Sequence, residues 1–212
     1  MTGRFTDHLR AISQPTWENA VNHRFITALY AGEVPDAAMK NYLIQDYRFL
    51  DSFLVLIGAA ITQADTLEAR LRFGRFAGMI SSDEDTYFQR AFAALGINEA
   101  EAAKNPDTAP TAGFKAIMRE AAATGSYPVI LSVLNVAEWL YYEWASAAPQ
   151  PLPENFIYAE WVTLHDNPDF NAFVAFIRSE LDRTGPNAPD ICEAFFKRAV
   201  VLEEQFFDAA YA

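Results

Sequence analysis

One long stretch of the sequence, which starts at Pro35-Asp36 and reaches residue 60, repeats apolar side chains at steps of three and four residues. The series is formed by Met39, Leu43, Asp46, Leu50, Phe53, Ile57 and Ala60. This spacing lines the residues up along one side of an α-helix, and proline is tolerated at its start because it needs no amide donor there. A long helix with one apolar side has to bury that side, so the chain is expected to pack helices around a common core.

Further segments carry the same periodicity, and no segment shows convincing strand alternation. The expected helices cover residues 16–31, 67–79, 82–95, 111–123, 128–146, 155–164, 168–183 and 189–210. Ser81-Ser82-Asp83-Glu84 resembles a capped helix start, and Thr184-Gly185-Pro186-Asn187 breaks the chain between two helices. The loops at 105–110 and 149–153 are too short to be domain linkers. The sequence therefore predicts an all-α, single-domain bundle of about eight or nine helices over residues 1–212.

Charge and composition narrow the classes of function. Lys plus Arg number 16 and Asp plus Glu number 28, so the net charge is −12 at pH 7. Nucleic acid and anionic membrane surfaces both need a basic face, so neither is an expected partner. The most apolar run, residues 53–61, is far shorter than the about 20 residues that span a bilayer, and the N-terminal segment lacks the apolar core of a signal peptide. The single cysteine, Cys192, excludes an internal disulfide and is expected to be a buried packing residue, so we expect a cytoplasmic protein.

Three acidic residues interrupt helix faces that otherwise look buried. Asp46, Glu138 and Glu203 each have apolar or aromatic neighbours one helical turn away. A cap, an arginine partner or a position at the edge of the stripe would explain any one of them, but three on separate helices indicate that they converge inside the bundle. We expect an aromatic pocket with a few carboxylates, suited to a flat, nitrogen-rich, protonatable ligand. The residues expected to stack on such a ligand are Trp139, Tyr141, Phe114 and Phe207.

A metal site is the main alternative for clustered carboxylates. Di-iron helical bundles use a Glu-x-x-His motif, and none of the histidines (His8, His23 and His165) follows an acid by three residues. His23 is expected to be a satisfied core histidine or a hydrogen-bond partner of Asp46. His165 ends a helix that carries Trp161 and is a candidate pocket residue. The sequence also has no Gly-x-Ser-x-Gly elbow, P-loop or dinucleotide fingerprint, so we expect neither a metal nor a cofactor.

A series of aromatic and acidic segments runs through the chain from residue 17 to residue 211. It consists of Trp17, HRF at 23–25, Gly32, YLIQDYRFL at 42–50, Tyr127, AEWLYYEWA at 137–145, WVTLH at 161–165 and LEEQFFDAAY at 202–211. In their order and spacing these segments resemble the TenA, or thiaminase II, family. The resemblance implies a haem-oxygenase-like fold without haem, a homodimer or homotetramer, and an active site for aminopyrimidines of thiamin salvage.

The resemblance also implies roles for individual residues. Asp46 corresponds to the aspartate that contacts the pyrimidine, and Tyr141 to the tyrosine one turn past the family's usual nucleophile. Glu203 corresponds to the C-terminal acid of a Glu-x-x-Phe-Trp/Phe motif. The catalytic cysteine of the family falls at Ala137, and Glu138 follows it immediately.

Tyrosines that usually line the pyrimidine site fall at Phe49, Phe114 and His165. This pattern resembles the TenA_E subgroup, in which a glutamate replaces the cysteine. The subgroup implies hydrolysis of aminomethylpyrimidine to hydroxymethylpyrimidine, or of formylaminomethylpyrimidine to aminomethylpyrimidine, and thiamin itself is not expected to react.

In the resulting hypothesis, Asp46 accepts a hydrogen bond from the pyrimidine amino group and Glu203 addresses a ring nitrogen. Glu138 activates water or attacks the substrate directly in place of a thiolate. The expected substrate-binding residues are Asp46, Tyr141, Phe49, Phe114, His165 and Phe207. The alternatives are a non-catalytic binder of a heteroaromatic metabolite and a metal-dependent oxidase on the same fold. A transcription regulator is disfavoured by the net charge of −12.

Overall fold

The computed structural model describes residues 3–212, apart from the side chains of Glu99 and Glu101. Residues 1 and 2 of the expected domain therefore lie outside the described residues. The described part consists of α-helices joined by short loops, with no strand, which confirms the predicted all-α class. Its helices are α1 (Phe5–Ile12), α2 (Thr16–Val21), α3 (Arg24–Ala31), α4 (Asp36–Gln63), α5 (Leu67–Met79), α6 (Asp85–Leu95), α7 (Glu99–Lys104), α8 (Ala109–Ala123), α9 (Tyr127–Ser146), α10 (Phe156–His165), α11 (Pro168–Thr184) and α12 (Pro189–Ala209).

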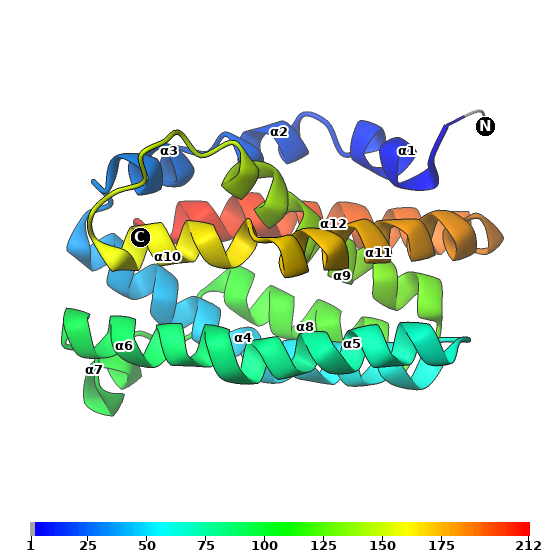
Figure 1. The fold of residues 1–212 in the computed structure, drawn as a ribbon, viewed down its shortest axis with the longest axis horizontal. Helices are drawn as coiled ribbons and strands as arrows, with labels where there is room; N and C mark the ends of the chain where they lie inside the picture. Colours follow the sequence, from blue (N-terminus) through cyan, green and yellow to red (C-terminus); the bar gives the residue numbers. More distant parts are fainter. Residues whose placement is uncertain (1–2) are drawn as a thin grey trace.

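Most of the longer helices run along the long axis of the molecule (Figure 1). In that view α1, α2 and α3 form the upper edge, α10, α11 and α12 the middle, and α4, α5, α6 and α8 the lower part. Helix α9 packs against α4, α8, α10, α11 and α12. Its side chains Val129, Leu131 and Leu134 point to different sides of the helix, yet each is fully buried. A helix that is apolar all round belongs in the core, so α9 is the central element of the bundle.

Helix α4 confirms the periodicity from which its position was predicted. Every member of the apolar series between residues 39 and 60 is buried, including the carboxylate of Asp46. The helix packs along α5 on one side and α8 on another. Its buried side faces the interior over many turns and can therefore supply both core residues and site residues.

The prediction of one helix over residues 16–31 is wrong, because the chain turns at His23. The backbone of His23 is extended (φ −61°, ψ 148°), and its Nδ1 accepts a hydrogen bond from the Phe25 amide at 3.1 Å. The imidazole thus caps α3 and satisfies an amide that has no partner within the helix. On its other side, Nε2 lies 3.1 Å from the Asp208 carboxylate. His23 is therefore a satisfied histidine, as the first alternative expected, but it caps a helix at a partly exposed position instead of lying in the core, and its partner is Asp208 and not Asp46.

The expectation of a capped helix start at residues 81–84 is also wrong. Helix α5 continues into α6 through a π-helical turn, Ile80–Glu84, so the two helices form one continuous rod at the lower edge of Figure 1. The Ser82 hydroxyl donates to the Gly78 carbonyl at 2.9 Å and caps no helix. A π turn adds a residue to the helical repeat and so changes the direction of the side chains around it. Such turns are frequent at functional sites.

Other differences concern short elements. The described residues hold twelve α-helices instead of about eight or nine, because α1 and α7 were not expected and residues 16–31 form two helices. The break predicted at residues 184–187 is confirmed by a 3-10 turn, Gly185–Asn187. None of the described helices combines the length and apolarity needed to cross a bilayer.

Candidate functional site

A cavity lies between α4, α8, α9, α10 and α12 and is closed on one side by the π turn. About 390 Å³ of the space between its walls is free of atoms, and this space includes open solvent. The apolar and aromatic part of its wall consists of Phe49, Leu50, Phe53, Phe114, Met118, Ala137, Tyr141 and Trp161. The polar part consists of Asp46, Glu84, Glu138, His165 and Glu203.

The structure brings the three predicted carboxylates together from three helices. Asp46 on α4, Glu138 on α9 and Glu203 on α12 all line the cavity, and they are only 4%, 6% and 3% exposed. The ion pairs of the described residues include none of them. Arg48, the base closest to Asp46 in sequence, pairs with Asp107 at 3.2 Å instead. The described part of the chain also holds no group of three or more His, Cys, Asp or Glu that could bind a metal ion.

Two carboxylate oxygens in the wall lack any hydrogen-bond partner. These atoms are Asp46 Oδ2 and Glu203 Oε2, and both are buried. Burial raises the pKa of Asp46, Glu138 and Glu203 well above the ordinary range, and neighbouring carboxylates raise it further. Acids that share one water-poor space cannot all ionise, so part of the set keeps its protons near neutral pH. The cavity therefore offers acceptors and proton donors side by side.

Glu84 is a fourth carboxylate in the wall and was not identified from the sequence. It is the last residue of the π turn and is partly exposed. Burial nevertheless raises its pKa to about 7, and its charge raises the pKa of Asp46 and Glu138. A usable signal exists in the sequence, because Glu84 continues a helical series of buried residues. That series is Phe73, Phe76, Ile80, Glu84 and Tyr87.

Hydrogen bonds between three aromatic residues fix Tyr141 in the wall. The hydroxyl oxygens of Tyr42 and Tyr141 lie 3.0 Å apart, and Trp161 Nε1 donates to the Tyr42 hydroxyl at 3.2 Å. Burial raises the pKa of both tyrosines well above the ordinary value, so both hydroxyls remain protonated. The structure thus places Tyr141 in the pocket, as predicted, and shows that Tyr42 supports it from behind.

His165 lines the cavity as predicted and is neutral. Its Nδ1 lies 2.8 Å from the Trp161 carbonyl oxygen, which can only accept, so Nδ1 carries the proton. Burial lowers the pKa of His165 to about 4, although the bond to the carbonyl opposes this shift. The imidazole packs beside Tyr141, with ring centroids 4.9 Å apart. Its Nε2 is therefore an acceptor.

The predicted phenylalanines divide into two groups. Phe49 and Phe114 line the cavity, and their ring centroids lie 5.4 Å apart. Phe207 is not part of the lining. Its fully buried ring packs against Phe25 at 5.7 Å and against Tyr141 at 6.0 Å. Phe207 therefore supports the wall from behind and does not face the cavity.

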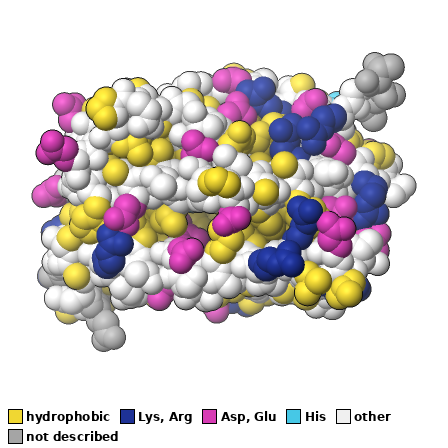
Figure 2. All heavy atoms as spheres, viewed as in Figure 1, with side chains coloured by type: hydrophobic (Ala, Val, Ile, Leu, Met, Phe, Trp, Pro, Cys, Tyr) yellow, Lys and Arg dark blue, Asp and Glu magenta, His cyan; other side chains and the backbone are white. Residues whose placement is uncertain are grey.

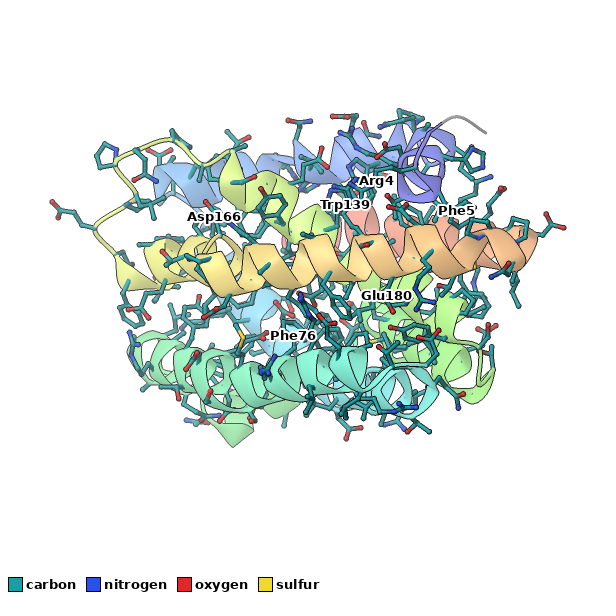
Figure 3. All side chains as sticks on the ribbon, turned by 45° about the vertical axis from the view of Figure 1, so that its right-hand side comes forward. Arg4, Phe5, Phe76, Trp139, Asp166 and Glu180 are labelled. Atoms are coloured by element: carbon teal, nitrogen blue, oxygen red, sulfur yellow. The ribbon has the colours of Figure 1, made fainter. Side chains whose placement is uncertain are left out.

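Two other residues considered from the sequence also lie away from the cavity. Trp139 lies beneath the Arg178 guanidinium, at 3.8 Å from ring centroid to Cζ, on the side of α9 that faces the N-terminal helices (Figure 3). It is two residues from both Ala137 and Tyr141, and a step of two residues nearly reverses direction on a helix. Cys192 is a buried free thiol outside the lining, as expected of a packing residue. The described wall therefore presents Ala137 and no thiol.

An outer hollow adjoins the cavity. About 580 Å³ of space, which includes open solvent, lies free of atoms between the π turn and the junction of α10 with α11. The hollow shares two wall residues with the cavity, Glu84 and His165. Figure 2 shows the surface hollowed between the rod of α5 and α6 and the rod of α10 and α11. Phe76 projects from α5 into this space (Figure 3) and stacks on Phe173 at 3.7 Å. Glu84 and His165 thus lie where the cavity and the hollow meet.

Comparison with known proteins is consistent across sequence and structure. Residues 10–212 match the family model described as the TENA/THI-4/PQQC family. A protein of Halalkalibacterium halodurans named aminopyrimidine aminohydrolase is 24% identical, with 98% of this chain and 95% of that protein covered. A protein of the same name from Bacillus subtilis is 26% identical, with 98% and 90% covered. The solved TenA homologue of P. horikoshii OT3 has a TM-score of 0.86 at 22% identity over 99% of both chains, which confirms the predicted haem-oxygenase-like fold.

Proposed function

The chain belongs to the TENA/THI-4/PQQC family, and we propose that it hydrolyses aminopyrimidines derived from thiamin. The proposed reactions convert aminomethylpyrimidine to hydroxymethylpyrimidine, or formylaminomethylpyrimidine to aminomethylpyrimidine. Support for this class comes from the relatives named aminopyrimidine aminohydrolase, which align with nearly the whole chain. The observation that carries the proposal is the set of unpaired, buried carboxylates in an aromatic cavity.

An aminopyrimidine complements this wall chemically. Its amino group offers N–H donors beside a basic ring nitrogen, and Asp46 Oδ2 and Glu203 Oε2 are acceptors without donors. A buried acceptor without a partner is unfavourable by about 1–3 kcal/mol, so a ligand that supplies the donors binds with that advantage. A Glu203 that keeps its proton would donate to a ring nitrogen instead of accepting from it. The rings of Phe49 and Phe114 supply flat apolar surface for the heterocycle.

The proposed mechanism assigns one task to each carboxylate. Asp46 accepts from the exocyclic amino group and fixes the ring, while Glu203 addresses the ring nitrogen and stabilises charge that develops on the heterocycle. Glu138 removes a proton from water as the water oxygen attacks the carbon, or its own carboxylate attacks that carbon first. The carbon–nitrogen bond then breaks and the nitrogen leaves with a proton. In this proposal Glu138, which lines the cavity beside Ala137, acts in place of a thiolate.

The test is a chromatographic screen of the purified protein with aminomethyl- and formylaminomethylpyrimidine, and with thiamin as the negative substrate. We expect turnover of at least one pyrimidine, and a loss of about 100-fold or more in kcat for Glu138→Gln and for Glu203→Gln. Glu204→Gln is the matched control for Glu203→Gln, because Glu204 is partly exposed, does not line the cavity and accepts a hydrogen bond from Asn19 at 2.9 Å. Turnover by Glu138→Gln within a few-fold of the wild type would remove Glu138 from the chemistry.

A non-catalytic binder of a heteroaromatic metabolite is the second candidate. It is favoured by one observation, the alanine at position 137 in the cavity wall. A binder would bind candidate pyrimidines, as measured by calorimetry, and would leave them chemically unchanged after prolonged incubation. Product formation in the chromatographic screen would exclude this role.

A further inference from the structure

Glu84 lies where the cavity meets the outer hollow. Of the carboxylates in the cavity wall, Glu84 is the one that also lines the hollow. The hollow continues outward, because it shares Phe76, Met79 and Asp169 with a surface groove beside α5 and α11. Glu84 can therefore touch a ligand on one side and exchange protons with solvent on the other.

The π turn gives Glu84 this position. Ser81, Ser82 and Asp83 in the same turn are exposed, whereas Glu84 is directed toward the cavity. The pKa of Glu84 is raised by burial, and no cation of the described residues opposes that shift. Irregular turns of this kind are common where a helix has to aim one functional side chain.

We propose that Glu84 is a further catalytic residue, the acid that protonates the leaving nitrogen in the hydrolysis. This inference rests on the proposed function. Both candidate reactions require a proton for the leaving nitrogen. The amine leaves a methylene carbon in one reaction and a formyl carbon in the other. In each case the water oxygen forms the new bond to carbon, and the carbon–nitrogen bond breaks with its electron pair going to nitrogen. The water proton goes to Glu138, and the Glu84 proton goes to the leaving nitrogen.

The other three carboxylates are less suited to this task because Asp46, Glu138 and Glu203 are buried, whereas Glu84 is partly exposed. A donor that loses its proton in each turnover has to regain one, and Glu84 faces the outer hollow from which protons arrive. The groups around it favour the protonated form. Asp46 from α4 and Glu138 from α9 are acidic, His165 from α10 is neutral, and Asp169 at the start of α11 adds negative charge to the hollow. An acid with a pKa of about 7 is matched to proton transfer near neutral pH.

The experiment measures kcat and KM against pH for the wild type, Glu84→Gln and Glu84→Asp with the aminomethyl substrate. Asp83→Asn is the matched control, because Asp83 belongs to the same turn and is exposed. We expect the wild-type kcat to fall as the pH rises through about 7, since the acid is then deprotonated. Glu84→Gln is expected to lose about 100-fold in kcat and to lose this alkaline fall. Glu84→Asp should recover part of the rate, and Asp83→Asn should match the wild type.

Three results would overturn the assignment. The first is a Glu84→Gln variant with wild-type kcat at every pH. The second is a variant with raised KM and unchanged kcat, which would show that Glu84 only binds the substrate. The third is a lowered kcat that keeps the wild-type pH profile, with circular dichroism confirming the fold. A wild type that turns over no aminopyrimidine refutes the proposed function and this inference with it, so the two failures are distinguishable.

Discussion

Replacing Glu84 by glutamine is expected to change how the stability of the unliganded protein depends on pH. The folded state raises the pKa of Glu84 from 4.5 to about 7. Below the lower value both the folded and the unfolded chain carry the proton, and the stabilising contribution of the protonated group is complete. Between pH 4.5 and about 7 the unfolded chain releases the proton while the folded chain still holds it, so folding becomes less favourable. Above about pH 7 the folded chain buries a charged carboxylate, and the stabilising contribution is lost. Glutamine does not titrate, so Glu84→Gln escapes this loss.

The size of the effect follows from the pKa shift. A pKa raised from 4.5 to about 7 corresponds to about 3 kcal/mol between the two protonation states. Glu84 is partly exposed, so solvent screening reduces its contribution to the free energy of unfolding to about 1–2 kcal/mol. We subtract the free energy of unfolding of the wild type from that of Glu84→Gln at each pH. This difference is expected to be about 1–2 kcal/mol larger at about pH 8 than at about pH 4.

The assay is urea unfolding of the wild type and the variant at both pH values, with Asp83→Asn as the control. Comparing variant with wild type at each pH cancels the titration of the groups that do not interact with Glu84. Asp46 and Glu138 do interact with it, because the Glu84 charge raises their pKa, so removing that charge adds to the gain at the higher pH. Asp83→Asn should show no comparable gain, because its side chain is exposed. A gain for Glu84→Gln below about 0.5 kcal/mol, or a loss, would refute the view that this carboxylate is held in a water-poor site.

Three further predictions concern binding, packing and the thiol. Asp46→Asn should weaken aminopyrimidine binding about 10-fold or more in calorimetry, because a charge-assisted hydrogen bond is lost, and an unchanged Kd would remove Asp46 from the site. Gly185→Ala should destabilise the fold by about 1–3 kcal/mol in urea unfolding, because a Cβ there would overlap the Phe5 ring. Gly58→Ala, with open space at its Cβ on α4, should instead stabilise by about 0.5–1 kcal/mol, and equal effects at both sites would contradict the packing. Cys192→Ala should retain turnover within about two-fold, since the thiol is buried outside the cavity, and a large loss would return the thiol to the mechanism.

Much of the fold could be predicted because long helices with one buried side leave a regular pattern in the sequence. The series on α4 and the nearly apolar α9 are examples. Short elements leave a weaker pattern, so α1 and α7 were not expected. The turn at His23 depends on a side chain capping an amide two residues ahead, and the apolar periodicity continues across it. Periodicity alone therefore does not locate such a break.

The residues of the candidate site likewise divide into those that the sequence pattern predicts and those that it does not. Asp46, Glu138 and Glu203 were recognisable because an acid among buried apolar neighbours is anomalous, and the cavity brings these three together. Glu84 meets the same criterion within its helical series, but serines and aspartates beside it made the segment look like a helix cap. Phe207 looked like a stacking residue, although adjacent residues on a helix point about 100° apart and only the packing decides which side faces the cavity.

The most direct test of the central claim is a crystal structure of the protein with 4-amino-5-hydroxymethyl-2-methylpyrimidine, the product of the proposed deamination. We predict that the pyrimidine lies inside the cavity, with its amino group within hydrogen-bond distance of Asp46 and a ring nitrogen facing Glu203. The ring should contact Phe49 or Phe114. A pyrimidine bound elsewhere on the molecule, with the cavity carboxylates still lacking donors, would contradict the claim that these acids are arranged for a flat basic heterocycle.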